Sequence, residues 1–221
     1  MTSAASKLWS GLVVLAIVWV IANLVMTERV ENEISAQAIA SLDGAASLID
    51  RASVTASGRD VTLGGGALAP QAGEDAARAM ATSPGVRLVH ETTVPIPSAK
   101  PYVFAARRDG SNLLLTGHVP LPAVRDQIVE AARRSLPGIA VVDRTTYAPG
   151  APDNFAAIAA YGVTQAARLV DGTLLLSDAA YSIAGATWTP ANFDAAMTAT
   201  RTLPEGATLA KADITPPGAR P

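Results

Sequence analysis

The stretch Asn112–Pro122 reads NLLLTGHVPLP, and the expected fold of the chain follows from it. Its apolar run, Leu113–Leu115, is typical of a buried strand, but a glycine stands just beyond it and a proline follows five residues after that glycine. Glycine permits a bend or a close approach of two backbones, and proline in the first helical turn has no hydrogen bond to lose. The stretch therefore predicts a strand, a joint at Gly117 and a helix that begins near Pro122.

The same spacing occurs three times along the chain. A central glycine is followed by a proline five residues later in the pairs Gly65 and Pro70, Gly117 and Pro122, and Gly185 and Pro190. A further glycine, placed just before a last strand-like run, follows each central glycine by 20 or 21 residues: Gly85, Gly138 and Gly206. We interpret these nine residues as the structural motif of an internal repeat, because self-similarity at a regular spacing indicates repeated units of structure.

Each copy reads as strand, helix and strand, and two copies carry a helix in front. Helical spacing of apolar residues occurs near residues 28–42 and again at 155–169, whereas the middle copy begins directly with a strand-like run at 102–108. The prediction is an α+β chain with an N-terminal transmembrane helix and three tandem αββαβ modules, of which the middle one lacks its first helix. The predicted modules and the tail are residues 28–97, 98–152, 153–217 and 218–221.

The first 27 residues predict a transmembrane anchor. Residues 8–26 carry no charge, and a helix of this length rises about 28 Å, close to the thickness of a hydrocarbon core. Lys7 precedes the apolar run and acidic residues follow it. The positive-inside rule then predicts a cytoplasmic N-terminus, a single pass through a bacterial inner membrane and a periplasmic remainder. A cleaved signal peptide is the alternative, which would leave the chain in the periplasm or at the outer membrane.

These motifs resemble those of the BON domain. The matching residues are Val61–Gly65, Leu113–Val119 and Ser182–Gly185, with turns at Pro84–Val86 and Pro137–Ile139. The resemblance implies an αββαβ fold, a role in the cell envelope and phospholipid binding. An anchor followed by such modules is also similar to the N-terminal region of alphaproteobacterial OmpA-family proteins. Peptidoglycan, the partner of the C-terminal domain in those proteins, is expected here only if a further domain exists beyond residue 221.

The residue types argue against most catalytic chemistry. The chain has no cysteine and two histidines, His90 and His118, so thiol catalysis and a histidine-rich metal site are not expected. The triple glycine at 64–66 lacks the lysine that follows the glycines of a phosphate-binding loop. We therefore expect a protein that is not an enzyme and that has no cofactor and no metal. The net charge of −2 gives no reason to expect nucleic acid as a partner.

Basic residues gather in the middle module. Residues 98–152 carry seven basic and four acidic groups, whereas acidic groups outnumber basic ones in the flanking modules. An ordinary solvated surface is one interpretation of this excess, and a surface that binds anions is the other. The arginines assigned to such a surface are Arg107, Arg108, Arg125, Arg133 and Arg134.

The leading functional prediction is an envelope protein whose modules form a homo-oligomer, with a ring as one form, or bind a partner. Small αβ layers leave sheet edges open, and open edges are natural contact surfaces. The alternative is a module that binds anionic phospholipid through the arginines of the middle copy.

Overall fold

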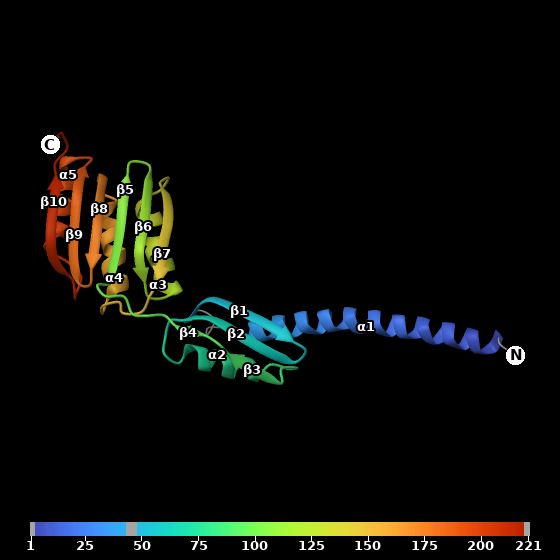
Figure 1. The fold of residues 1–221 in the computed structure, drawn as a ribbon. Helices are drawn as coiled ribbons and strands as arrows, with labels where there is room; N and C mark the ends of the chain where they lie inside the picture. The colour runs from blue at the N-terminus through green and yellow to red at the C-terminus, as the bar shows by residue number, and fades with distance from the viewer. Residues whose placement is uncertain (1–2, 43–47, 219–221) are drawn as a thin grey trace. The chain divides into compact units, whose positions relative to one another are not determined.

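The computed structural model describes the backbone of residues 3–42 and 48–218, and their side chains except those of residues 3–13 and 22–28. The chain is α+β and divides into two compact units, Met1–Pro95 and Ile96–Pro221. Each unit has its own sheet, and helical segments pack against each sheet (Figure 1).

The first unit contains the helices α1 (Ser3–Ser41) and α2 (Ala72–Ala81) and a small sheet. Its strands are β1 (Ile49–Ser57), β2 (Asp60–Ala67), β3 (Leu88–Glu91) and β4 (Val94–Pro95). β1 pairs antiparallel with β2, and β3 and β4 pair parallel with the other side of β2, so β1 is an edge strand. Side chains four residues apart on α1 pack on this sheet and on α2 to form the core: Ile34, Ala38, Leu42, Val61, Leu63, Ala76 and Met80.

The predicted transmembrane anchor is wrong by the criteria of length and hydropathy. A spanning helix needs about 20 apolar residues. No helix in the described part of the chain is long and apolar enough to cross a membrane. This finding also overturns the predicted single-pass location in the inner membrane.

The second unit begins with β5 (Val103–Asp109), β6 (Asn112–Val119), α3 (Pro122–Ser135) and β7 (Ala140–Tyr147). It continues with α4 (Phe155–Ala166), β8 (Leu169–Ser177), β9 (Ala180–Thr187), α5 (Pro190–Ala199) and β10 (Thr208–Thr215). All six strands form one sheet in the order β10-β9-β8-β5-β6-β7, with the helices on one face (Figure 1). The segments predicted as the second and third modules thus share one sheet and one core.

Aromatic residues anchor that core near the start of β5. The ring of Phe155 at the start of α4 meets the rings of Tyr102 and Phe104 edge to face, at centroid distances of 5.1 and 5.8 Å. The hydroxyl of Tyr102 donates a hydrogen bond to the carbonyl of Ala148 at 3.1 Å, and burial raises the pKa of this hydroxyl. The three rings therefore fix α4 on β5 without leaving the buried hydroxyl unsatisfied.

The glycine at the end of the apolar run in β6 permits a close backbone approach. Gly117 has φ +94°, and a Cβ atom at this position would overlap the carbonyl oxygen of Val103 in β5. Gly185 of β9 faces the carbonyl of Asp171 in the same way, and Gly65 of β2 lies against Asp50 and Ile49. The joint predicted at these positions is thus a site where two strands approach too closely for any side chain.

The other motif residues mark helix starts and turns. Pro122 and Pro190 are the first residues of α3 and α5, whereas Pro70 lies in a turn two residues before α2. Each remaining glycine of the motif has a positive φ between +83° and +91° in the turn before the last strand: Gly85, Gly138 and Gly206.

Candidate interaction surfaces

The described residues contain no cluster of metal-binding side chains. Among them, no group of three or more His, Asp or Glu side chains lies close enough together to hold a metal ion. His118 uses Nδ1 in a 3.1 Å hydrogen bond with the hydroxyl of Thr146, within the sheet. The features that stand out are surfaces of the sheets: a strand pairing, an open sheet face and free edges.

The central pairing of the second unit joins the two predicted modules through main-chain hydrogen bonds. β5 and β8 pair antiparallel over seven positions, from Val103 opposite Ser177 to Asp109 opposite Asp171. We call this pairing the β5–β8 seam. At its middle Ala106 lies opposite Leu174. Ala106 also pairs with Leu115, and Leu174 with Ile183, and each of these partners stands two residues before a bend glycine.

The seam is therefore nearly two-fold symmetric in its register. At its centre, Ala106 of the β5–β6 hairpin faces Leu174, which holds the same position in the β8–β9 hairpin. This is the geometry of an isologous contact, in which two like surfaces meet each other.

Arg108 is buried at this seam on the helix-covered face. Its side chain is 6% exposed, and Nη1 donates a 2.6 Å hydrogen bond to the carbonyl of Ala167, the C-cap residue of α4. Its guanidinium carbon lies 5.9 Å from the ring centroid of Trp188, and burial lowers its pKa. A cation at a helix C-terminus is favourable because the unpaired carbonyls carry partial negative charge. Arg108 thus links α4 to β5 and adds no charge to the surface.

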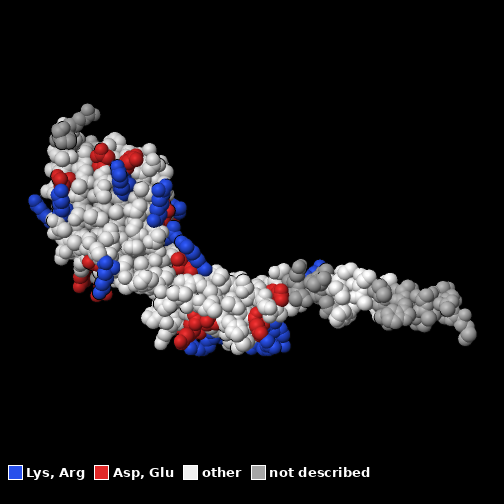
Figure 2. Space-filling model, viewed as in Figure 1, with Lys and Arg blue, Asp and Glu red and all other residues white. Residues whose placement is uncertain are grey.

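The face of this sheet that the helices leave uncovered carries small and apolar side chains with a few charges. We call it the open face. Register places two rows of side chains next to each other across the strands. One row is Val142, Leu114, Arg107, Thr173, Ala184 and Asp213, and the other is Arg144, Thr116, Ala105, Leu175, Ser182 and Lys211. Val142 and Leu175 are each 40% exposed. Figure 2 shows that this side of the sheet is mostly uncharged, with separate charged groups over it.

The five arginines predicted to form one anion-binding surface lie in different environments. Arg107 is exposed on the open face, whereas the next residue, Arg108, is buried on the opposite face because side chains alternate along a strand. The other three belong to the α3 side of the sheet: Arg125, Arg133 and Arg134. The structure therefore does not bring the five guanidinium groups together.

Acidic partners hold two of the three arginines of α3. Arg125 forms an ion pair with Asp143 of β7 and donates a 3.2 Å hydrogen bond to the hydroxyl of Tyr147. Burial works to raise the pKa of Asp143, but hydrogen bonds from Thr145 and Arg125 outweigh it and hold the pKa below its usual value. Arg133 pairs with Glu130 at 3.0 Å, and Nε of Arg134 donates to the carbonyl of Glu130 at 3.3 Å.

The hollow beside α3 has mixed charge. Its volume is about 360 Å³, and its charged lining consists of two arginines and three acidic residues: Arg125, Arg133, Asp126, Glu130 and Asp143. A site for an anion would need the opposite balance of charge. Sequence reasoning saw the arginines of the helix but not the carboxylate that β7 places against them, because that contact spans 18 residues.

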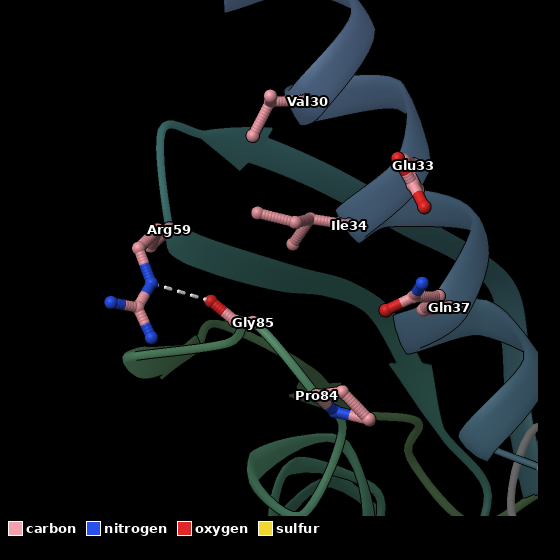
Figure 3. Close-up of a pocket in the computed structure, with 7 residues that line it drawn as sticks. All are labelled: Val30, Glu33, Ile34, Gln37, Arg59, Pro84 and Gly85. Atoms are coloured by element: carbon pink, nitrogen blue, oxygen red, sulfur yellow. Dashed lines mark hydrogen bonds between the residues drawn. The ribbon is translucent and has the colours of Figure 1, made fainter.

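A second hollow, of about 350 Å³, lies in the first unit between α1 and the turn before β3 (Figure 3). Val30, Glu33, Ile34 and Gln37 of α1 line one side, and Arg59, Pro84 and Gly85 line the other. Nε of Arg59 donates a 2.8 Å hydrogen bond to the carbonyl of Gly85, which holds the guanidinium beside this turn (Figure 3). One cation with one nearby carboxylate gives this hollow no clear preference for a charged ligand.

Sequence reasoning missed Arg144, which is exposed on the open face together with Arg107. The alternation of Val142, Asp143 and Arg144 in the last strand of the module was a usable signal, since it puts Arg144 and Asp143 on opposite faces. Among the described residues, neither Arg107 nor Arg144 forms an ion pair.

Comparison with known families identifies one part of the chain. Residues 104–149 match the BON-like domain. No curated protein matches the chain. The BON-like domain begins in β5 and ends just after β7, so it contains the bend at Gly117, the helix start at Pro122 and the turn at Gly138. Through β5 it also contributes one strand of the β5–β8 seam. The predicted resemblance to a BON domain is thus confirmed for the middle segment.

Proposed function

We propose that this chain is a non-enzymatic assembly protein of the cell envelope, whose αβ modules associate with each other and with further copies of the chain. A BON-like domain at residues 104–149 fits an envelope-associated role. The observation that carries the proposal is the β5–β8 seam, in which this domain is joined to the following αβ segment by strand pairing rather than by a separate interface.

We also take the three predicted modules as copies of one unit. Supporting this, each contains a hairpin followed by a helix and a strand parallel to the second hairpin strand. In each hairpin, the residue two positions before the bend glycine pairs with an equivalent residue of the first strand. These pairs are Leu63 with Val54, Leu115 with Ala106, and Ile183 with Leu174. A protein built from such units buries sheet edges by placing one unit beside another, and exposed edges are the surfaces through which more units add.

Size-exclusion chromatography with light scattering on the full chain tests this function. We expect a mass that is a multiple of the monomer mass and that falls on dilution. A protein that stays monomeric at micromolar concentration would show that the modules do not assemble copies of the chain. Recovery of the native protein only in the cytosolic fraction of its own cells would contradict the envelope role.

Binding to anionic phospholipid is the second candidate, and the open face is the surface that favours it. Arg107 and Arg144 lie there without ion-pair partners among the described residues, near the exposed apolar side chains of Val142 and Leu175. Cations beside apolar groups suit an anionic lipid surface. Asp109 and Asp171 face each other at one end of the seam, and their two negative charges weaken the attraction of this surface for anionic lipid.

Co-sedimentation with vesicles that contain anionic lipid separates the two arginine groups. Arg107→Ala/Arg144→Ala should lower salt-sensitive binding if lipid is the ligand. Arg133→Ala/Arg134→Ala removes the same charge from α3 and is the matched control, with little expected effect. Equal binding by the wild type and both double variants would rule out this use of the open face.

A further inference from the structure

The outer edge of β1 has no strand partner among the described residues. β1 pairs with β2 alone, while the corresponding first strands of the second unit, β5 and β8, pair with each other. An edge strand presents a row of unpaired N–H and C=O groups that another strand can extend.

The register of β1 matches that of the two strands that meet at the seam. Val54 lies opposite Leu63, two residues before the bend at Gly65. Ala106 and Leu174 have this same relation to the bends at Gly117 and Gly185. Because Ala106 and Leu174 face each other across the seam, the equivalent contact of β1 would place Val54 opposite a second Val54.

β1 carries the charged residues Asp50 and Arg51 and a bulge between Asp50 and Ser53 at its start, but the rest of its length lacks the features that protect the other outer strands. From Ala52 to Ser57 it carries no charge and no proline, and Ala52, Ser53, Thr55 and Ser57 are exposed. The outer strands elsewhere carry charged side chains within their paired length: Glu91 in β3, Asp143 and Arg144 in β7, and Lys211 and Asp213 in β10. Charges are a common means of blocking edge-to-edge pairing, so β1 is the edge best suited to accept a strand.

An exposed apolar side chain on α1 supports a contact on the same side. Figure 3 shows Val30, Glu33 and Gln37 on the side of α1 that borders the hollow at Pro84 and Gly85. At about 100° per residue, Ile39 lies close to half a turn away from Val30 and Gln37 and about a third of a turn from Glu33, and it is 54% exposed. The exposed side chains close to it in the sequence at positions 36 and 40 are small alanines.

We propose that β1 pairs antiparallel with β1 of a second copy of this chain, with Val54 on the two-fold axis. Ser53 of one copy then lies opposite Thr55 of the other, and two three-stranded paths join into one six-stranded sheet like that of the second unit. The occupant is a second copy because the seam within the chain joins like strands in the same symmetric register. The inference rests on the proposed self-association and names the surface that carries it.

Charge substitution on β1 tests both the surface and the register. Ser53→Asp/Thr55→Asp puts like charges directly opposite each other in the proposed dimer, as does Ser53→Lys/Thr55→Lys. Each double variant should raise the dimer dissociation constant by about tenfold or more, because opposed like charges destabilise strand pairs. An equimolar mixture of the two variants should restore association, since every pair is then Asp opposite Lys. Restoration also shows that both variants fold.

The matched control is Thr208→Asp/Ala210→Asp on β10, an exposed outer strand that should leave the self-association unchanged. Loss of association in this control together with normal association of the β1 variants would move the interface away from β1 and overturn the inference.

Cross-linking gives a second readout, because the chain has no cysteine of its own. A mixture of Ser53→Cys and Thr55→Cys proteins, treated with a short bismaleimide, should form more cross-linked dimer than either protein forms when it is treated alone. Thr62→Cys, opposite Thr55 but one strand inside the edge, should cross-link little. An oligomer that shows neither charge repulsion nor this cross-link would overturn the β1 interface while self-association stands. A monomeric wild type would overturn both.

Discussion

Ala106 of β5 lies directly opposite Leu174 of β8, and the two residues hold the same position in their respective hairpins. Both side chains are fully buried beneath the helices. The pairing joins a BON-like domain to the next αβ segment in one sheet, so the two segments share a core and should unfold together. The same relation predicts how strongly individual residues of the seam contribute to stability.

Leu174→Ala should destabilise the second unit by about 2–5 kcal/mol, the range for removing a buried leucine side chain. Leu174 has no exposed surface and packs against Gly162 of α4, so the lost side chain leaves a cavity under the helix. Leu175→Ala is the matched control, because this neighbour is 40% exposed on the open face and should cost less than about 1 kcal/mol. Urea unfolding measures both, and equal losses would contradict the assigned faces of β8.

Gly117→Ala should destabilise the second unit by more than about 2 kcal/mol. The added Cβ would overlap the carbonyl of Val103, and the positive φ adds strain to any L-residue. Gly138→Ala has the same backbone strain at φ +83°, but no atom lies within 4 Å of its Cβ, so it should cost only about 1 kcal/mol. Hydrogen exchange of the β5–β6 hairpin should rise in the first variant alone. Similar losses in both would mean that the close approach of the strands is unimportant.

Arg108→Ala should cost about 2–3 kcal/mol, since it removes buried packing and leaves the carbonyl of Ala167 without its donor. Arg108→Met keeps the packing and should cost less, because Nε of Arg108 is already buried without a hydrogen-bond partner among the described residues. Arg107→Ala, one residue away and exposed, should change the free energy of unfolding by less than about 0.5 kcal/mol. A larger loss for Arg107→Ala than for Arg108→Ala would contradict the buried position of Arg108.

Asp143 should make stability fall at acid pH. Its pKa is lower in the folded protein than in the unfolded chain, so its contribution is fully present above about pH 4 and is lost as the pH falls through the folded value. Asp143→Asn should cost about 1–2 kcal/mol at neutral pH by weakening the bonds from Arg125 and Thr145. The difference from wild type should shrink below pH 4. A difference that stays constant to pH 2 would show that the carboxylate charge is unimportant.

Local patterns predicted most of the elements correctly. The strand at Leu113–Leu115 lies in β6, and Pro122 and Pro190 begin α3 and α5. These features depend on residues close together in the chain, namely alternation, a fixed proline φ and a glycine at a bend. The anchor, predicted from the length, the lack of charge and the flanking charges of residues 8–26, is wrong, because no helix in the described part of the chain is long and apolar enough to span a membrane.

The candidate surfaces were harder to predict. Arg107 and Arg108 are adjacent in sequence, yet one is exposed and the other is buried against Ala167, 59 residues away. Arg125 was predicted to bind an anion, but in the structure Asp143 of β7 forms an ion pair with it. Charge counts along a chain do not include partners that arrive from other elements, so they overestimate free charge.

By itself, the sequence determined local elements: strands, helices and turns, with glycines where backbones bend or approach and prolines where two of the helices begin. Only the tertiary structure decided that β5 and β8 pair with each other, that β1 lies at a sheet edge, and which arginines have an acidic partner. The reason is physical: hairpins, turns and helix starts are set by neighbouring residues. The second partner of a strand can come from any part of the chain that has an unpaired strand edge. Which of these pairings has the lowest free energy depends on the whole fold.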